Sequence, residues 1–168
     1  MLNSALAIIR DEHRSLAAVV HGLRYLIREM RERQAVPDFR LLWAMIFYLE
    51  EFPEKLHHPK ENAYLFARLR ERTHEADEVI AHLEQQHSDG AGHIRDLELA
   101  LGHFEAESPD GLEKFSAAVE TFADEIVRHM AVEENTLIPL AKKNLTTEDW
   151  VEIGAAFSEN GDPRFDAD

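Results

Sequence analysis

The sequence predicts an all-α protein: an up-down-up-down four-helix bundle with a short fifth helix at its C-terminal end. Four long segments carry apolar residues at alternating steps of three and four, the spacing that places them on one helix face. The seven glycines and six prolines are few, and Pro37, Pro109 and Gly111 lie at breaks between these segments. The 168 residues, 45% of them hydrophobic, suit a single domain over 1–168 with one sizeable core.

Short connections between the long segments favour the up-down-up-down arrangement, in which sequential helices pack side by side. Pro53 and Pro59 fall inside the second segment, where the missing N–H and the ring predict a kink or a local break. The four long helices are expected at about 4–33, 39–72, 75–104 and 112–144, and the short fifth helix at about 147–158.

Charge and composition exclude several classes of function. The formal net charge of −15 disfavours binding to the phosphates of nucleic acids, and no run of 18 apolar residues predicts a membrane span. The N-terminus has no basic region ahead of its apolar residues and reaches Arg10 early, so a cytoplasmic protein is expected. Because there is no cysteine and there are ten histidines, any metal would be held by nitrogen and oxygen.

Histidine and glutamate side chains stand inside otherwise apolar helix stripes. His13 fills the one gap in the stripe of the first helix, and His87 takes an inward position on the third. His129 and Glu133 continue the stripe of the fourth helix. A buried carboxylate without a partner is unfavourable unless it is neutralised, so these positions call for a counter-charge, which metal ions supply.

The second and fourth helices share a His-x-x-x-Glu pattern. HHPKENAYLFARL begins at His57 and HMAVEENTLIPLA begins at His129, and aligning the two brings Glu61 onto Glu133. Residues four apart on a helix share a face, with Cβ atoms about 5–6 Å apart. Each pair can therefore present an imidazole and a carboxylate to the same ion.

Together these side chains form a donor set for two metal ions in the core. Each carboxylate can bridge both ions, about 3.5–4 Å apart, and the four imidazoles can bind two to each ion. Both ions then keep open positions for water, oxide or a small ligand, which suits iron, and after it manganese, better than a closed tetrahedral zinc site. The expected metal ligands are His13, His57, Glu61, His87, His129 and Glu133.

A simpler interpretation exists for each of these residues taken singly. One core histidine is more often a hydrogen-bonded packing residue, and one His-x-x-x-Glu pair can be an ordinary surface pair. The whole set at matched depth is what favours metal. His58 is a further candidate ligand, because the nearby prolines leave the phase of the helix open there.

Four segments, DEHRSL, HHPKENAYLF, LEQQHS and RHMAVEENTLIPLA, resemble the ligand segments of hemerythrin-like (HHE cation-binding) domains. The resemblance covers nearly the whole chain, to about Asn144. It implies a four-helix bundle around a non-haem di-iron centre, bridged by carboxylate and by an oxo, hydroxo or water ligand. The positions that match the family's ligands are His13, His57, Glu61, His87 and His129.

Two positions depart from the oxygen-carrying members of that family. Leu83 stands where those proteins have another third-helix histidine, so the set looks closer to hemerythrin-like proteins of nitric-oxide or oxidative-stress responses. The acid of the fourth helix follows its histidine by five residues in oxygen carriers, which points to Glu134, whereas the inward stripe points to Glu133. Glu134 is therefore a further candidate ligand.

The leading interpretation is a di-iron protein that binds or reacts with oxygen, nitric oxide or peroxide in sensing or a stress response. The alternatives are an enzyme of peroxide or nitric oxide detoxification or of iron–sulfur cluster repair, and an iron store or oxygen carrier. The sequence shows no Ser or Cys nucleophile and no nucleotide motif, and no attached output domain is expected. The sequence therefore leaves three questions open: whether the protein is an enzyme, whether it has a protein partner and whether it forms an oligomer.

Overall fold

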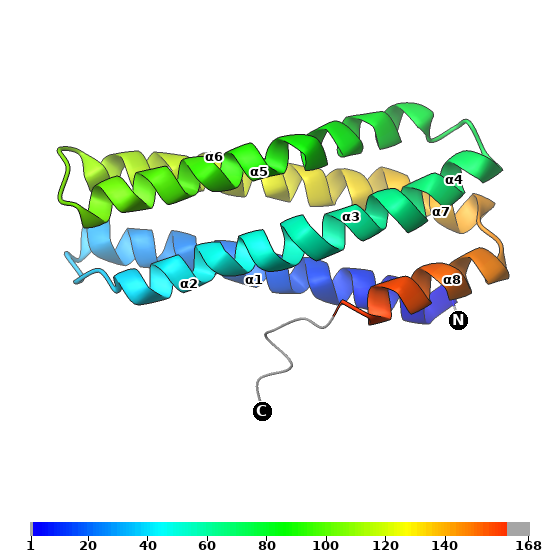
Figure 1. The fold of residues 1–168 in the computed structure, drawn as a ribbon, viewed down its shortest axis with the longest axis horizontal. Helices are drawn as coiled ribbons and strands as arrows, with labels where there is room; N and C mark the ends of the chain where they lie inside the picture. The colour runs from blue at the N-terminus through cyan, green and yellow to red at the C-terminus, as the bar shows by residue number, and fades with distance from the viewer. Residues whose placement is uncertain (1, 161–168) are drawn as a thin grey trace.

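The computed structural model describes residues 2–160, with side chains from Ser4 onward, and this part of the chain forms helices and loops but no strand. The all-α bundle is confirmed: four long helical rods alternate in direction, and a short fifth helix packs beside the first rod (Figure 1). The first rod is α1 (Leu2–Glu32), where 4–33 was expected. None of the helices within residues 2–160 combines the length and hydrophobicity of a membrane span.

The second rod stays helical through both of its prolines. It does so with two π-helical stretches, η1 and η2, in which some N–H groups bond five residues back. The N–H of His58, for example, bonds to the carbonyl of Pro53. The expected local break is therefore absent between residues 39 and 72, all of which are described. In chain order this rod consists of α2 (Phe39–Leu49), η1 (Glu50–His57), α3 (His58–Lys60), η2 (Glu61–Phe66) and α4 (Ala67–Arg72).

The third and fourth rods complete the bundle. A π-helical stretch, η3, again precedes a proline in the fourth rod, and the N–H of Ile138 there bonds to the carbonyl of Glu133. The third rod is α5 (Asp77–Glu105), the fourth consists of α6 (Gly111–Val132), η3 (Glu133–Leu137) and α7 (Ile138–Asn144), and the short helix is α8 (Thr147–Ser158).

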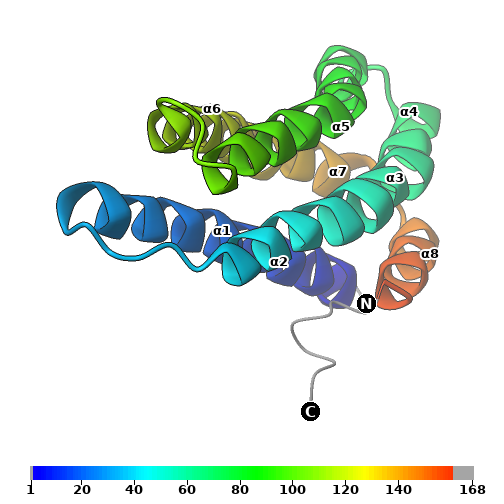
Figure 2. The same ribbon diagram turned by 60° about the vertical axis from the view of Figure 1, so that its left-hand side comes forward.

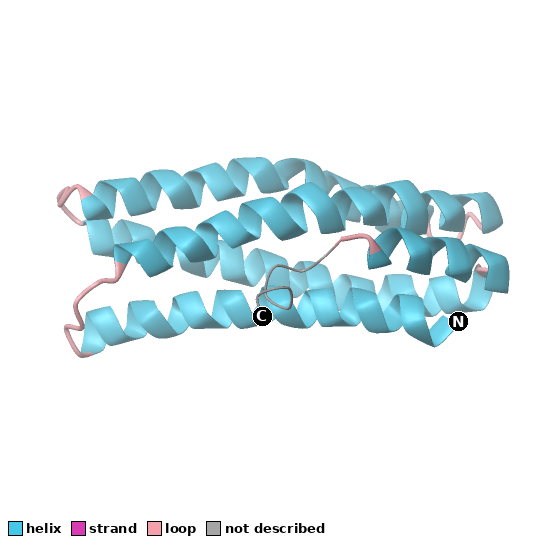
Figure 3. Ribbon diagram, turned by 60° about the horizontal axis from the view of Figure 1, so that its bottom comes forward, coloured by secondary structure: helices cyan, strands magenta, loops and turns pink. Residues whose placement is uncertain are grey.

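Each rod packs against two others. α1 lies beside α2 and α6, and α5 lies beside α6 and α2, so the four rods form a ring around one long core (Figure 2). α8 packs on the N-terminal part of α1, where Gly154 approaches Ala5 closely. The rods are joined at both ends of the bundle by short loops (Figure 3).

A polar layer divides the core into two apolar clusters. One cluster lies toward α8 and includes Ile9 and Phe66, and the other lies toward the opposite end and includes Leu16 and Ile94. Along α1, the polar layer falls between Ile9 and Leu16, at His13. Because burial of each large apolar side chain contributes about 1.5–3 kcal/mol, packing on both sides holds the polar layer in place.

Side chains also fix the helix ends. Asp38 accepts a hydrogen bond from the N–H of Leu41 and caps the second rod, an interaction of about 1 kcal/mol. Thr146 and Asp149 form a capping box at the start of α8. Asp149 also accepts two hydrogen bonds from Arg72, each of 2.9 Å, which join α8 to the second rod.

Candidate metal centre

Seven histidine and glutamate side chains from all four rods meet in the polar layer. Each side chain is at most 7% exposed. Because charged side chains are rarely buried without a partner, their burial together calls for charges that compensate one another. Both glutamates are the first residue of a π-helical stretch, a feature that often accompanies functional sites. The seven are His13 on α1, His57, His58 and Glu61 on the second rod, His87 on α5, and His129 and Glu133 on the fourth rod.

Glu61 presents one oxygen to each half of this layer. Its Oε1 lies 3.0 Å from Nε2 of His57 and 3.5 Å from Nε2 of His13. Its Oε2 lies 3.2 Å from Nε2 of His87. A single carboxylate therefore faces two sets of imidazoles at once.

Glu133 is arranged in the same way. Its Oε2 lies 3.1 Å from Nε2 of His13. Its Oε1 lies 2.8 Å from Nε2 of His129 and 3.8 Å from Nε2 of His87. Both carboxylates thus span the layer, which is the arrangement that would let each of them bridge two ions.

The imidazoles fall into two groups that share Glu61. Within each group, one donor atom from every residue lies within 4.8 Å of the others, close enough to converge on one ion. We call the groups the two-histidine side and the three-histidine side. The first contains His13 and His57, and the second contains His58, His87 and His129.

His58 enters the layer directly after His57, although neighbouring residues on a regular helix point about 100° apart. Its ring stacks on the ring of His87, with centroids 4.2 Å apart and 13° between the planes. His58 therefore supplies a fifth imidazole from the second rod. Leu83 on the third rod has no imidazole to offer, and its side chain is fully buried in the apolar cluster toward α8.

Glu134 points away from the centre of the layer. Its side chain is 32% exposed and accepts hydrogen bonds from Arg10, the shortest of them 3.2 Å. It approaches the outer nitrogen of His13, with Oε1 3.7 Å from Nδ1. The geometry therefore favours Glu133 over Glu134 as a metal ligand.

Several buried donor atoms in the layer have no hydrogen-bond partner among the described residues. A buried polar atom without a partner costs about 1–3 kcal/mol, so native cores keep few of them. Imidazole nitrogens and carboxylate oxygens that converge from four rods fit metal ions, which would satisfy them together. Those that face into the layer are Nε2 of His13, Nε2 of His57, Oε2 of Glu61 and both carboxylate oxygens of Glu133.

Opposite charges stabilise the layer in the metal-free protein. Burial would lower the pKa of His57, but Glu61 and a hydrogen bond with Glu12 outweigh burial and raise that pKa to about 9. Burial and Glu61 oppose the charge on Glu133, yet three imidazoles that lie against its oxygens hold the pKa of Glu133 well below its usual range. His58 differs, because burial lowers its pKa to about 4 and keeps the ring neutral.

We expect the metal-free protein to lose stability as the pH rises from about 6.5 to about 9. His57 and His87 each have a pKa raised to about 9 in the folded protein, so their charged forms stabilise it fully only below the unfolded pKa of about 6.5. The effect is on the order of 1.4 kcal/mol per pKa unit. Urea unfolding of the metal-free protein across this pH range measures it.

The metal-loaded protein is the control for that experiment. Coordinated imidazoles carry no proton on the ligating nitrogen, so its stability should rise over the same pH range. A metal-free protein whose stability stays constant or rises would contradict the charge pairing.

Polar side chains just outside the layer orient three of its histidines. In each case Nδ1 bonds to an oxygen outside the layer, which leaves Nε2 directed inward. Sequence-based prediction misses these partners because each lies on a different rod from its histidine. Their one sequence signal is that each is adjacent to another residue of the layer. The pairs are Glu12 with His57 (2.5 Å), Asn62 with His87 (2.8 Å) and Gln86 with His129 (2.7 Å).

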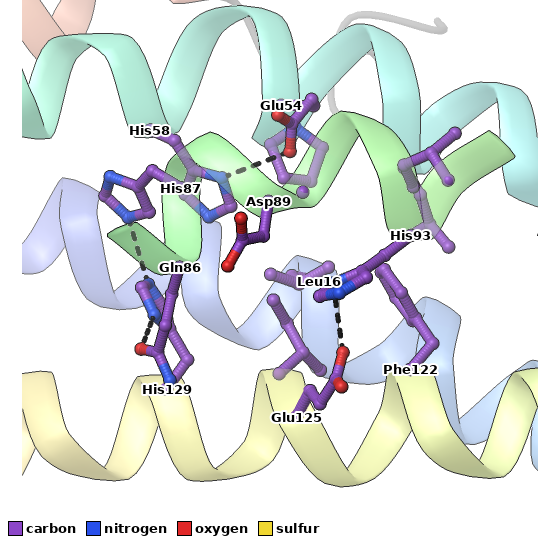
Figure 4. Close-up of a pocket in the computed structure, with 15 residues that line it drawn as sticks. Leu16, Glu54, His58, Gln86, His87, Asp89, His93, Phe122, Glu125 and His129 are labelled. Carbon is purple, nitrogen blue, oxygen red and sulfur yellow. Dashed lines mark hydrogen bonds and ion pairs between the residues drawn. The ribbon is translucent and has the colours of Figure 1, made fainter. Parts of the chain in front are cut away.

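A cavity of about 260 Å³ adjoins the three-histidine side. Figure 4 shows His58, His87 and His129 at one end of it, and the ion pair of His93 with Glu125 at the other. Since a water molecule occupies about 30 Å³, the cavity has room for small molecules beside the layer. Its apolar walls are formed by Leu16, Leu49, Ile94, Phe122 and Ile126.

A four-helix bundle with imidazoles and carboxylates projecting into its core is the architecture of a metal-binding bundle protein. Residues 4–141 match the family model of the hemerythrin HHE cation-binding domain. The chain belongs to this family, and the matched range includes all seven residues of the layer. No curated protein matches the sequence at a significant level. The polar layer is therefore the candidate cation site of a hemerythrin-like domain.

Proposed function

We propose that the protein holds a pair of iron ions in the polar layer and uses them to bind or transform oxygen, nitric oxide or peroxide. The observation that carries this proposal is the position of two buried carboxylates, Glu61 and Glu133. Each of them directs one oxygen to the two-histidine side and the other to the three-histidine side. These carboxylates would bridge the ions. The remaining ligands would be His13 and His57 for one ion, and His58, His87 and His129 for the other.

Iron suits this donor set best. Imidazole and carboxylate ligands without thiolate favour iron, and then manganese, and the chain contains no cysteine. The two-histidine side offers two imidazoles and two carboxylate oxygens, which leaves octahedral positions for oxo, hydroxo, water or a small ligand. When bound, the ions would supply redox and Lewis-acid chemistry, while the chain supplies orientation, counter-charge and an apolar surrounding.

The cavity favours a small exogenous ligand over a purely structural metal site. Its apolar walls reach the imidazoles of the three-histidine side and would admit neutral molecules of two to four atoms. An enzyme of peroxide or nitric oxide detoxification or of cluster repair would use the same access and is the second candidate. Iron storage is less favoured, because the layer has donors for only two ions among the described residues.

Rapid mixing of the reduced protein with candidate ligands tests this proposal. Reduced, iron-loaded protein is mixed separately with oxygen, nitric oxide and hydrogen peroxide while its visible absorption is followed. We expect a rapid spectral change with at least one of them. Ile94→Phe, which narrows the cavity, should slow the change, and Leu99→Phe, on the exposed face of the same helix, should not. Iron-loaded protein that responds to none of the three would contradict the proposal.

His58→Ala is expected to weaken the binding of one of the two ions by at least about tenfold, because it removes one imidazole of the three-histidine side. Titration of the metal-free protein with ferrous iron under anaerobic conditions measures this. His93→Ala is the matched control, since His93 lines the same cavity but pairs with Glu125 at 3.0 Å. Equal affinities in the two variants would remove His58 from the ligand set.

A further inference from the structure

The two sides of the layer differ in what stands behind their histidines. On the two-histidine side, Oε2 of Glu12 lies 2.5 Å from Nδ1 of His57. Because an ionised carboxylate can only accept a hydrogen bond, Nδ1 is the donor. Glu12 is 6% exposed, and its Oε1 accepts a hydrogen bond of 2.9 Å from Asn160, which follows α8. A buried negative charge is therefore held in place behind this imidazole.

On the three-histidine side, neutral amides take that place. Nδ1 of His87 bonds to Oδ1 of Asn62 at 2.8 Å, and Nδ1 of His129 bonds to Oε1 of Gln86 at 2.7 Å. These hydrogen bonds orient the rings as the Glu12 hydrogen bond does. They bring no charge with them.

The two sides do not differ in the other carboxylates near their outer imidazole nitrogens. Glu134 lies 3.7 Å from Nδ1 of His13, and Glu54 lies 3.6 Å from Nδ1 of His58. Both distances are too long for a hydrogen bond, and each side has one such carboxylate. The difference that remains is one hydrogen-bonded carboxylate on the two-histidine side against two amides on the other.

A carboxylate behind a ligating imidazole makes that imidazole a stronger donor and places negative charge near the ion. Both effects stabilise a trivalent ion more than a divalent one. On the other side, a third neutral imidazole adds a donor without adding charge. The two positions should therefore differ in reduction potential.

We infer that the two iron positions are inequivalent, and that the ion between His13 and His57 is oxidised first. The inference rests on the proposed function. When an external one-electron oxidant such as ferricyanide acts on the diferrous protein, that ion passes from Fe²⁺ to Fe³⁺ and ferricyanide becomes ferrocyanide. The ion on the three-histidine side stays ferrous until a second equivalent is added. Glu12 is thus a positioning residue that sets the order of oxidation.

Redox titration of the iron-loaded protein tests the inference, with Mössbauer spectra recorded at one oxidising equivalent. The unmodified protein should show two separate one-electron steps. Glu12→Gln keeps the shape but removes the charge, so it should raise the lower potential and bring the steps together. A tenfold loss in the preference of this position for ferric over ferrous iron corresponds to about 59 mV for a one-electron couple.

Two further variants provide an independent test and a control. Gln86→Glu adds a carboxylate behind His129 and should lower the higher potential, even if Glu12→Gln does not fold. Glu125→Gln removes a charge beside the same cavity without touching a ligand, because Glu125 pairs with His93. Its potentials should match those of the unmodified protein.

The outcomes separate the two proposals. Coincident steps in iron-loaded protein, or equal shifts in Glu12→Gln and Glu125→Gln, would overturn this inference and leave the iron pair intact. Protein that takes up no iron would overturn the proposed function, and this inference with it.

Discussion

Replacing both bridging candidates, Glu61→Ala with Glu133→Ala, is expected to abolish the binding of both metal ions. Each of these carboxylates faces imidazoles on both sides of the layer, so no ion would keep an anionic ligand. The remaining imidazoles are neutral donors in a buried site, where an uncompensated dication is strongly unfavourable. Metal analysis after anaerobic loading with ferrous iron measures the loss.

Glu134→Ala provides a matched control for that variant. Glu134 is adjacent to Glu133 and carries the same charge, but it pairs with Arg10 at the edge of the layer. It should retain both ions. Equal metal content in the control and in the double variant would mean that the two buried carboxylates are not the bridges.

Metal-free protein is expected to melt about 8–16 °C below protein that is saturated with iron. A ligand that binds only the native state adds about 4 kcal/mol when its free concentration is 1,000 times Kd. For a chain of this size, each kcal/mol moves Tm by about 2–4 °C. The structural reason is that loading satisfies donor atoms of His13, His57, Glu61 and Glu133 that have no hydrogen bond within the described residues.

Thermal unfolding of metal-free and iron-loaded protein under anaerobic conditions measures this shift. The double variant at Glu61 and Glu133 is the control, since added iron should leave its Tm unchanged. If iron stabilises both proteins equally, the stabilising ions bind outside the polar layer.

The bundle could be predicted because each rod buries one stripe of its surface. Leu16, Val20 and Leu23 of α1 are all at most 2% exposed, and their spacing alone marks the inner face. Of the kink or local break expected at Pro53 and Pro59, the break is absent. Local propensity disfavours proline inside a helix, but π-helical hydrogen bonds bypass the missing donors, and buried packing of the rod keeps it continuous.

The layer could be predicted in part. His-x-x-x-Glu spacing places His57 beside Glu61 and His129 beside Glu133 whatever the rest of the fold does. The direction of His58 could not be derived, because it depends on the local π-helical phase around it. The partnership of Glu12 with His57 depends on which rods are neighbours, and the pattern of one helix carries no such information.

We expect the polar layer to hold a coupled pair of iron ions, and Mössbauer spectroscopy of protein loaded with isotopically enriched iron tests this most directly. After full oxidation, two ferric ions that share bridging ligands should couple antiferromagnetically. We expect two irons per chain. The spectrum at low temperature and in a weak applied field should consist of quadrupole doublets without magnetic splitting. One iron per chain, or a magnetically split spectrum of isolated ferric ions, would contradict the paired site.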